Sequence, residues 1–468
     1  MRKRTAVLFV VISAFVTVID LLAQSQEYNI LNYGAVADGK TVNTLFIQKA
    51  IDECSSNGGG TVVIPRGTFI TGQLELKNNV TLNVEKSGVL ESSIDIKDFC
   101  NDKNSQSLIS INNVSNVSLV GEGTINGRGD KFTIANEAPN RPYIVLAKNS
   151  KNIRIKDVTL KNSAYWSLRL LENEHVTIKG ITIYSHTNYN NDGIDIDSKD
   201  VIISDCTIDC DDDAICLKSD STSICENIVI SNCIIASNCN FIKFGTASRG
   251  GFKNISISNI TMRAASESNF RHWENRINGV KDSITGLAGI ALEIVDGGIM
   301  DRIAINNISM DGVQTPIFIK LGKRTPPVGS LKNVLISNIV AKTYSLIPSS
   351  ITGVPDSYVE NITLRDINIY VMGGGSLDQT KQTVLENEKG YPENRMFGHS
   401  LPGYGFYIRH AKNIVMENVQ FFLMNPDYRS VVFLEDAHNI KIRDFKADKP
   451  EGTQPLIQEI NTSEISTD

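Results

Sequence analysis

A short strand-like segment recurs along most of this chain and constrains its fold more than any other feature. The segments alternate β-branched and polar residues, as in NIRIKDVTL, HVTIKGITI and NIVISNCII, and this period-two pattern predicts β-strands. They begin at Val80, Val117, Ile153, Val176, Val201, Ile228, Ile255, Ile303, Val334, Ile362, Ile414 and Ile440. Most central intervals are 23 to 31 residues long, which indicates one coil of a solenoid per repeat.

The repeats predict an all-β fold, a parallel β-helix in which each coil stacks on the one before it. A length of 468 residues would otherwise suggest about three domains, whereas the continuous repeats favour a single domain over residues 24–468. A β-sandwich or a propeller needs tight hairpins, and the connections here carry almost no Asn-Gly or Asp-Gly at hairpin spacing.

An asparagine directly precedes nine of the twelve segments. These residues are Asn79, Asn116, Asn152, Asn227, Asn254, Asn333, Asn361, Asn413 and Asn439. Coils stacked about 4.8 Å apart would align them as a ladder, in which each side-chain amide bonds to its neighbours above and below. Several also begin a glycosylation sequence, such as Asn254-Ile255-Ser256, but the regular placement favours the ladder.

The segment NTLFIQKAIDECSSNGGG near the start has the periodicity of an amphipathic helix. The glycines at its end would terminate it. We expect this helix to cap the first coil and to cover its open strand edges. Its apolar side would consist of Leu45, Ile47, Ala50, Ile51 and Cys54.

The first 23 residues resemble a secretory signal peptide. A basic stretch at residues 2–4 precedes an apolar run at residues 6–19, which is short for a membrane span and typical of an export signal. A buried N-terminal helix is the alternative. We expect cleavage near Ala23, no membrane anchor, and a secreted or periplasmic protein. The formal net charge of −6 argues against nucleic acid as a partner.

Eight cysteines are present, and six of them fall within residues 206–239. An exported chain can oxidise such cysteines, although the sequence does not determine which of them pair. Zinc binding is disfavoured, since no two cysteines have CxxC spacing and no histidine lies among the six.

Acidic residues gather on three neighbouring coils. In the repeat register NNDGIDIDS (190–198) lies over DDDAICLKS (211–219), which lies over NCNFIKFGT (238–246). Asp192 and Asp213 then share one coil position, and Asp212 lies next to it. Crowded carboxylates shift each other's pKa, so that one can act as a general acid and another as a base, as glycoside cleavage requires. Because adjacent residues of a strand face opposite sides, Asp212 and Asp213 reach one cleft only at a bend.

Two other interpretations of this cluster stay open. One is a solvated acidic turn, and the other is a calcium site built from carboxylates. The calcium ligands would be Asp192, Asp209, Asp211, Asp212 and Asp213.

Together with NYGAVADGKT (32–41) and GGGTVVIPRGTF (58–69), the two acidic motifs make the chain resemble glycoside hydrolase family 28, the polygalacturonase family. The resemblance extends over nearly the whole mature chain. It implies a right-handed parallel β-helix. It also implies hydrolysis, with inversion and without a metal or other cofactor, of glycosidic bonds in a pectin-type polysaccharide or its oligosaccharides.

The resemblance also implies roles for single residues. Asp212 would protonate the departing glycosidic oxygen, while Asp192 and Asp213 would together orient and deprotonate the attacking water. Asn190 matches the asparagine of the family's first motif, and Lys218 matches a lysine that often follows the paired aspartates. We expect both of these to bind substrate.

Two departures from the family pattern concern the substrate. Where the family has Gly-His-Gly, this chain has Asn238-Cys239-Asn240, and where the family has an Arg-Ile-Lys motif that grips the substrate carboxylate, it has Ala291-Leu292-Glu293. Alanine and glutamate cannot bind a carboxylate as Arg and Lys do, which argues against ordinary endo-polygalacturonase activity. Lys243 is expected to bind substrate instead. The other candidate cations are Arg249, Arg271, Arg276, Lys320, Lys323 and Arg324.

Aromatic residues in the coil connections could stack on a sugar ring or pack against the solenoid. They are Trp166, Tyr189, Trp273 and Tyr404. Insertions around 262–288 and 372–405 would form walls that turn an open groove into a pocket, which favours exo action. The alternative functions are a calcium-dependent polysaccharide lyase and a non-catalytic carbohydrate-binding solenoid. We expect the protein to be a monomer.

Overall fold

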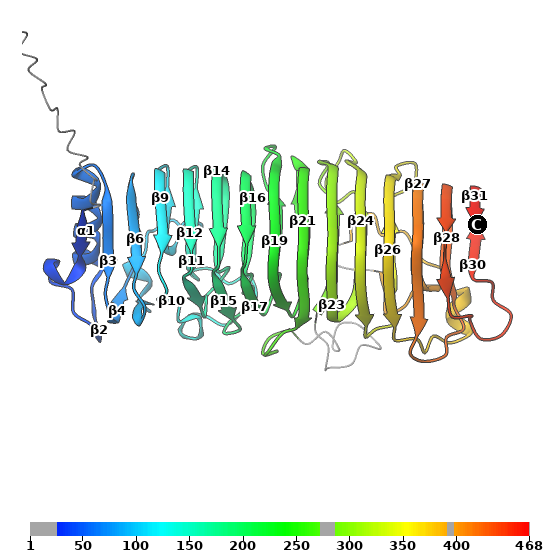
Figure 1. Cartoon of the computed structure of the whole chain (residues 1–468), viewed down its shortest axis with the longest axis horizontal. Coiled ribbons are helices and arrows are strands. Elements are labelled where there is room, and N and C mark those ends of the chain that lie inside the picture. The colour runs from blue at the N-terminus through cyan, green and yellow to red at the C-terminus, as the bar shows by residue number, and fades with distance from the viewer. Residues whose placement is uncertain (1–25, 272–285, 391–396, 468) are drawn as a thin grey trace, which may run out of the picture.

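The computed structural model describes residues 26–271, 286–390 and 397–467. The expected signal at residues 1–23 lies outside the described residues. Within them the chain forms one α-helix and 31 strands, which make a single long row of coils from the N-terminal to the C-terminal end (Figure 1). Consecutive coils pair in parallel, as β14 (Leu168–Lys179) does with β16 (Ile194–Ser204). The all-β fold and its parallel coils are therefore confirmed.

The strands before the acidic motifs are mostly short. They are β1 (Glu27–Asn29), β2 (Asp38–Val42), β3 (Gly60–Ile64), β4 (Gly67–Thr71), β5 (Leu74–Glu75), β6 (Val80–Val84), β7 (Gly88–Ser92), β8 (Ser107–Asn112), β9 (Ser115–Val120), β10 (Thr124–Asn126), β11 (Tyr143–Lys148), β12 (Lys151–Lys156), β13 (Thr159–Lys161) and β15 (Thr182–Ser185). Short 3₁₀ turns lie at Ile30–Tyr33, Ile96–Asp98 and Gly129–Lys131.

The strands from β17 on include several longer ones, because some later coils pass from one row of strands into the next without a break. They are β17 (Thr207–Cys210), β18 (Ile215–Ser219), β19 (Cys225–Ser237), β20 (Ile242–Ser248), β21 (Gly251–Ala264), β22 (Gly286–Ile294), β23 (Ile299–Leu321), β24 (Ser330–Thr343), β25 (Ser349–Thr352), β26 (Val359–Val371), β27 (Gly403–Leu423), β28 (Ser430–Arg443), β29 (Lys446–Ala447), β30 (Ile457–Ile460) and β31 (Ser463–Thr467). A further 3₁₀ turn lies at Asp378–Lys381.

The core is a stack of aliphatic side chains inside the coils. One column illustrates it: each residue pairs in register with the next, and each is at most 1% exposed. The column is Ile178, Ile203, Ile230, Ile257, Ile305, Ile336, Leu364, Met416 and Ile442. Because every coil buries only one side of each strand, the outward columns stay polar or mixed.

The predicted asparagine ladder is present. Asn116 donates to the side-chain oxygen of Asn79 at 2.9 Å, Asn254 to that of Asn227 at 2.8 Å, and Asn439 to that of Asn413 at 2.8 Å. All nine asparagines have φ between 51° and 61°. The left-handed conformation turns each coil at a corner, and asparagine tolerates it better than most residues. The corner conformation therefore explains the choice of residue, and the ladder follows from stacking.

The helix α1 (Thr44–Ser56) lies at the N-terminal end of the row, against β1 and β3 (Figure 1). It buries Ile47, Ala50, Ile51 and Cys54, as predicted. The prediction was wrong for Leu45, which is 84% exposed. This residue lies in the first turn of the helix, on the side away from the coils.

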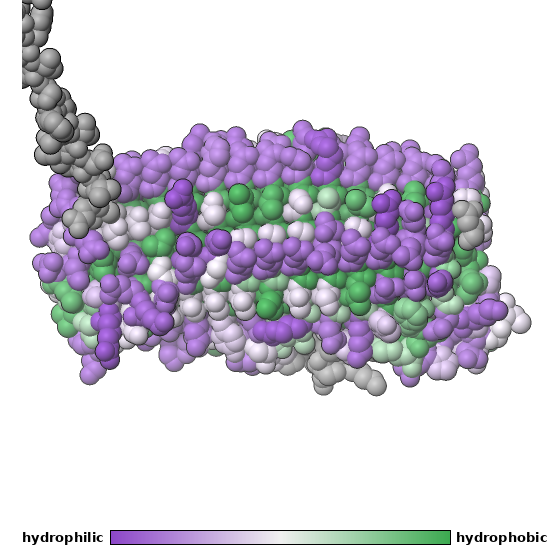
Figure 2. Space-filling model, viewed as in Figure 1, coloured by the Kyte–Doolittle hydropathy of each residue, from purple (hydrophilic) through white to green (hydrophobic). Residues whose placement is uncertain are grey.

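The repeated coils give the surface a striped character. Figure 2 shows hydrophilic and hydrophobic bands that run parallel to the long axis and alternate across it, because each outward column repeats one kind of residue from coil to coil. All eight cysteines are free thiols, and seven of them are buried.

No helix of the described chain is long and apolar enough to cross a membrane.

Candidate active site

The acidic motifs lie on three turns that enter successive strands of one row. Ile194 at the start of β16 pairs with Ile215 of β18, which pairs with Ile242 of β20. The residues two positions earlier, Asp192, Asp213 and Asn240, therefore occupy equivalent places on neighbouring coils. The register predicted from the repeats is confirmed.

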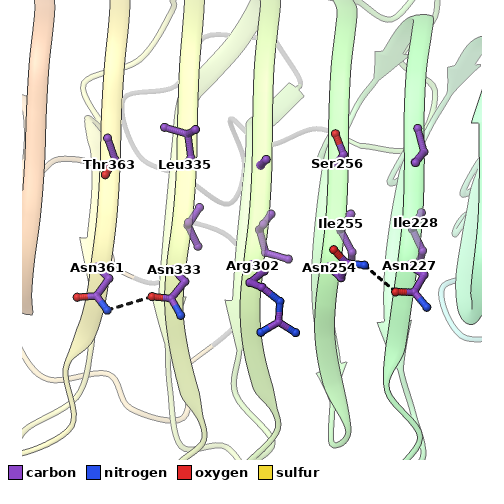
Figure 3. A pocket seen from close by; sticks show the side chains of 14 residues that line it. Asn227, Ile228, Asn254, Ile255, Ser256, Arg302, Asn333, Leu335, Asn361 and Thr363 are labelled. Atoms are coloured by element: carbon purple, nitrogen blue, oxygen red, sulfur yellow. Dashed lines mark hydrogen bonds between the residues drawn. The ribbon is translucent and has the colours of Figure 1, made fainter.

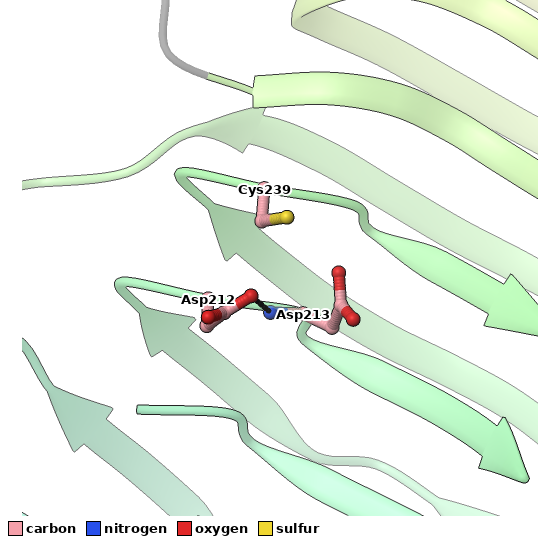
Figure 4. Close-up of side chains that lie close together, drawn as sticks. All are labelled: Asp212, Asp213 and Cys239. Carbon is pink, nitrogen blue, oxygen red and sulfur yellow. Dashed lines mark hydrogen bonds between the residues drawn. The ribbon is translucent and has the colours of Figure 1, made fainter. Parts of the chain in front are cut away.

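Asp212 and Asp213 lie in a bend rather than in a regular strand. The backbone N–H of Asp213 donates to the Asp212 carboxylate at 3.0 Å, and the carbonyl of Asp212 accepts bonds from Cys210 and Ser237. Figure 4 shows both aspartates on one turn, with Cys239 on the turn of the next coil. One ligand atom from each of the three lies within 4.8 Å of the others. Both aspartates therefore reach one site, as expected if they lie at a bend.

Asp213 is held as an anion. Its carboxylate accepts bonds from the side chains of Asn240 at 2.9 Å and Lys243 at 3.0 Å. Burial alone would raise its pKa, but Lys243, Lys218 and Asn240 together lower it to about 2. Asp213 can therefore orient a water molecule as a carboxylate across the whole physiological range.

The surroundings of Asp192 favour its protonated form instead. Burial, followed by the negative charge of Asp195, raises its pKa well above the ordinary value. Lys218 lies between the two carboxylates, 3.0 Å from Asp195 and 3.9 Å from Asp192. When this cluster holds a proton at neutral pH, Asp192 is a favoured place for it.

Asp212 contacts a residue from outside the row of strands. The guanidinium of Arg271 forms an ion pair with the carboxylate of Asp212. The side chains are 10% and 8% exposed. In this structure the carboxylate of Asp212 is therefore engaged by a guanidinium.

Asn190 is bound to the protein itself. Its side-chain oxygen accepts a bond from Arg141 at 2.9 Å, and its amide donates to Glu137 and Asn136 at 3.1 Å each. It adopts φ 56° at the corner before Asp192. Its observed contacts therefore tie the turn of Asp192 to the segment around residues 136–141.

Sequence reasoning missed several charged residues that surround the acids. Asp195 pairs with Lys218, and Arg169, one coil earlier, pairs with Asp220. Asp195 stands in register with Arg169 on one side and Cys216 on the other. The same register count that aligned Asp192 with Asp213 would have found it, whereas the approach of Arg141 and Arg271 depends on loops and leaves no periodic signal.

The predicted aromatic residues separate into two kinds. Trp166 lies one coil before Asp192, and the ammonium of Lys218 sits 4.5 Å from its ring centre. Tyr189 packs on Phe270 at 5.0 Å. Tyr404 is only 1% exposed and belongs to the core, so it does not contribute a sugar platform. Trp273 lies outside the described residues.

The position of the family's Arg-Ile-Lys motif is covered. Ala291 pairs in register with Lys243 but is fully buried, and it packs with Ala288 and Phe318 beneath Phe397. Leu292 and Glu293 are fully buried as well. A substrate carboxylate cannot reach this position through solvent.

The other candidate cations are spread over the molecule. Lys320 is 2% exposed and donates to the carbonyl of Asn387 at 3.1 Å, while Arg324 pairs with Asp296. Arg249 and Lys323 are exposed, and their positions along the coils are not in register with the three aspartates. Arg276 lies outside the described residues. Among the described candidates, Lys243 and Arg271 contact the aspartates.

The donor set does not fit calcium. Asp212, Asp213 and Cys239 form a group of three possible metal ligands, but calcium prefers oxygen donors over a thiol, and a cationic side chain already pairs with each carboxylate. Asp209 and Asp211, included in the proposed calcium set, bond instead to His186 and Asn238.

A groove of about 610 Å³ lies elsewhere, beside the asparagine ladder (Figure 3). It is lined by residues such as Asn227, Ser256 and Leu335. Arg302 replaces asparagine at one corner there, between Asn254 and Asn333. None of the three aspartates lines this groove.

Comparison with known proteins places the chain in a family. The sequence pattern of "Glycosyl hydrolases family 28" matches residues 54–390, and the chain belongs to this family. A probable polygalacturonase of Vitis vinifera is 31% identical over 220 residues, which cover 42% of this chain and 45% of that protein. An exo-poly-alpha-D-galacturonosidase of Dickeya chrysanthemi is 28% identical over 253 residues, which cover 40% and 41%. The chain thus spans less than half the length of either relative.

Solved structures share the fold. The family 28 exopolygalacturonase of Yersinia enterocolitica matches with a TM-score of 0.60 over 94% of this chain and 78% of its own, at 16% identity. The exopolygalacturonase of Thermotoga maritima matches with a TM-score of 0.55 over 74% and 87%, at 21% identity. At these identities the likeness concerns the fold alone.

Proposed function

We propose that the protein is a glycoside hydrolase that cleaves a pectin-type polysaccharide or its oligosaccharides. The observation that carries this proposal is the trio of almost buried carboxylates on two neighbouring turns, with Asp192 inclined to hold a proton and Asp213 held as an anion. Environments that drive neighbouring pKa values apart are what acid and base catalysis requires. Family membership supports the same chemistry.

In the proposed reaction Asp212 gives its proton to the departing glycosidic oxygen. Water attacks the anomeric carbon, its oxygen forms the new bond, and its proton passes to the pair Asp192 and Asp213. Without substrate, Asp192 is the carboxyl group of this cluster that favours a proton. The proposed reaction therefore requires the proton to lie on Asp212, and not on Asp192, when the glycosidic bond breaks. Lys218 and Lys243 stabilise the carboxylates that result. No metal takes part in any of these steps.

The decisive test is Asp212→Asn with a polymeric and an activated substrate. The amide keeps the volume but cannot donate a proton, so hydrolysis of oligogalacturonide should fall at least about 100-fold. Hydrolysis of a nitrophenyl glycoside, whose leaving group needs no acid, should fall far less. Asp213→Asn is the matched variant and should lose both activities. Near-normal turnover of the oligosaccharide by Asp212→Asn would rule the assignment out, and an unsaturated product absorbing in the ultraviolet would indicate a lyase.

We also propose that the anomeric centre is inverted, as family resemblance implies. Inverting enzymes usually separate their two carboxyl groups by about 6.5–9.5 Å, more than the distance between Asp212 and Asp213, so the base would include Asp192. Proton NMR of the first-formed product from the wild-type protein reports the anomer directly.

Exo action is the finer part of the proposal. The described residues of the 372–405 insertion lie over the outer face of the row beyond Lys243: Phe397 packs on Ala291 and Phe318, and Val384 accepts a bond from Arg409 at 2.8 Å. A groove closed one coil past the acids would accept a chain end rather than an internal stretch. The names of the Dickeya, Yersinia and Thermotoga relatives point the same way.

Exo action predicts the product pattern. Digestion of polygalacturonan should release one short product from the earliest time points, while the viscosity of the polymer falls slowly. Phe397→Ala would open the covered face, and a broader product ladder is expected from it. A rapid loss of viscosity with the wild-type protein would contradict the proposal.

We also propose the remaining expectations from the sequence. The coils would have the right-handed sense of the family, α1 would act as the cap of the first coil, and residues 24–468 would form one domain. Export follows from the signal-like residues 1–23, and we propose a monomer.

A further inference from the structure

Residues 263–271, here called the arm, leave the end of β21 and return over three earlier coils toward the acids. The backbone of Ser266 donates to Asp209 at 3.1 Å, and Arg263 donates to the same carboxylate at 2.8 Å. The side chain of Asn238 donates to the carbonyl of Glu267 at 2.6 Å. The arm is thus bonded to the coils at several points rather than lying loosely on them.

The groups that hold the arm are buried. Asp209 is 4% exposed, Asn238 1% and His186 1%. His186 bonds to Asp209 at 2.9 Å, and its carbonyl accepts a bond from Asn269 at 3.0 Å. Buried hydrogen bonds between polar groups specify one arrangement of the chain. These bonds therefore fix the path of the arm.

The last two residues of the arm lie at the site. Phe270 packs on Tyr189, and Arg271 reaches Asp212. The position where the family carries its Arg-Ile-Lys motif lies under Phe397, with Ala291 and Glu293 fully buried. A carboxylate on the substrate therefore needs its cation from elsewhere.

Two other cations near the acids are committed to carboxylates within the row of strands. Lys218 pairs with Asp195 at 3.0 Å, and Lys243 pairs with Asp213 at 3.0 Å. Their side chains are only 12% and 8% exposed. Arg271 differs because it comes from the arm rather than from the row of strands, and its partner is Asp212, the proton donor of the proposed reaction.

We propose that Arg271 binds the carboxylate of a uronic-acid unit at the cleavage site and releases Asp212 as it does so. This inference rests on the proposed function and names the charge of its substrate. The guanidinium exchanges one carboxylate partner for another, so the ion pair is conserved while Asp212 becomes free to take up the proton. An arginine suits this exchange because its planar donors match any carboxylate. The acid would then be made ready only when an anionic sugar is bound.

The test compares two substrates in each variant. Oligogalacturonide carries free carboxylates, and its methyl ester has the same sugars without the charge. For Arg271→Gln, kcat/KM on the free acid should fall about 10- to 100-fold, mainly through KM. On the methyl ester kcat/KM should rise, because Asp212 is no longer paired with the guanidinium. Arg271→Lys should recover part of the loss on the free acid. Because the ratio is taken within one protein sample, a smaller folded fraction does not affect it.

Arg263→Gln is the control on the same arm. It weakens the bond to Asp209 without touching Asp212, so it should change both substrates by the same factor. The inference is overturned if Arg271→Gln loses both activities equally, or if the wild-type protein prefers the methyl ester. Neither result would contradict the proposed hydrolase function. That function would be contradicted only if Asp212→Asn kept its turnover or if the wild-type protein cleaved neither substrate.

Discussion

Asp192 and Asp213 occupy equivalent positions on neighbouring coils and yet differ in proton affinity because of what lies beside them. Asp213 has Lys243 and Asn240 as direct partners, whereas Asp192 has the carboxylate of Asp195 on its far side and a more distant Lys218. Burial raises both pKa values, so the neighbouring charges decide the outcome. At the scale of single residues, function depends on these contacts rather than on the aspartates alone.

Lys243→Met tests this account. Lys243 helps to lower the pKa of Asp213 to about 2, so losing this cation should raise the pKa. Because Asp213 has to be a carboxylate in the proposed reaction, the acidic limb of the kcat/KM profile should move to higher pH, and activity should be lost first at low pH. The pH dependence of kcat/KM on oligogalacturonide measures the shift. Lys441→Met, at an exposed site, should leave the limb unchanged, and an unmoved limb in Lys243→Met would contradict the account.

At the scale of the elements, the corners between strands set the shape of each coil. Corner residues adopt the left-handed conformation, and a second row of them follows the ladder, in which Asn259 donates to Asn232 at 3.0 Å and Asn307 to Asn259 at 2.7 Å. The second row also explains the Asn or Asp in the middle of many repeats. Corners of constant geometry keep successive strands in register, and the register brings the acidic turns together.

Replacing Asn227 by Gly or Ala separates the two contributions of a ladder residue. Asn227 donates to Asp200 at 2.9 Å and accepts from Asn254 at 2.8 Å, with φ 58°. Glycine loses the bonds but keeps the conformation without strain, and should cost about 1–2 kcal/mol of unfolding free energy. Alanine loses the bonds and is also strained in the left-handed conformation, so it should lower the unfolding free energy by about 1 kcal/mol more than glycine does. Urea unfolding measures the two values, and equal values would show that the corner conformation contributes nothing.

At the scale of the whole molecule, a continuous core joins the acids to both ends. The column that contains Ile230 runs without a polar break from β14 to β28. Each coil is stabilised by its neighbours rather than by itself, as in other solenoids. The site is therefore supported by coils far from it in sequence, and loops on the outer face cover the coils just beyond it.

A continuous core predicts cooperative unfolding. Fluorescence of Trp166, near the acids, and far-UV circular dichroism, which reports all strands, should give the same urea midpoint. Ile230→Ala removes a fully buried side chain in the middle of the row and should lower both midpoints together, at a cost of about 2–5 kcal/mol. Trp273→Phe in the same background would leave Trp166 as the sole tryptophan probe. Two separated transitions would show that the row unfolds in parts.

The sequence by itself determined the repeat, its register and the placement of the acids. Alternation of buried and exposed residues is a local property, and parallel stacking turns equal spacing along the chain into neighbours in space. For that reason Asp192, Asp213 and Asn240 could be aligned by counting, and so could the asparagine corners. Asp195 was open to the same count.

Only the tertiary structure decided which charges meet those acids. The arm carries Arg271 back over three coils, Arg141 comes from a loop two coils before Asn190, and Phe397 covers Ala291 from an insertion more than a hundred residues later. These segments have no period, so their path depends on buried partners such as Asp209 and Asn238. The prediction for Leu45 was wrong for a similar reason. Helical periodicity shows which side of a helix is apolar, but it does not show which turns of the helix contact the coils.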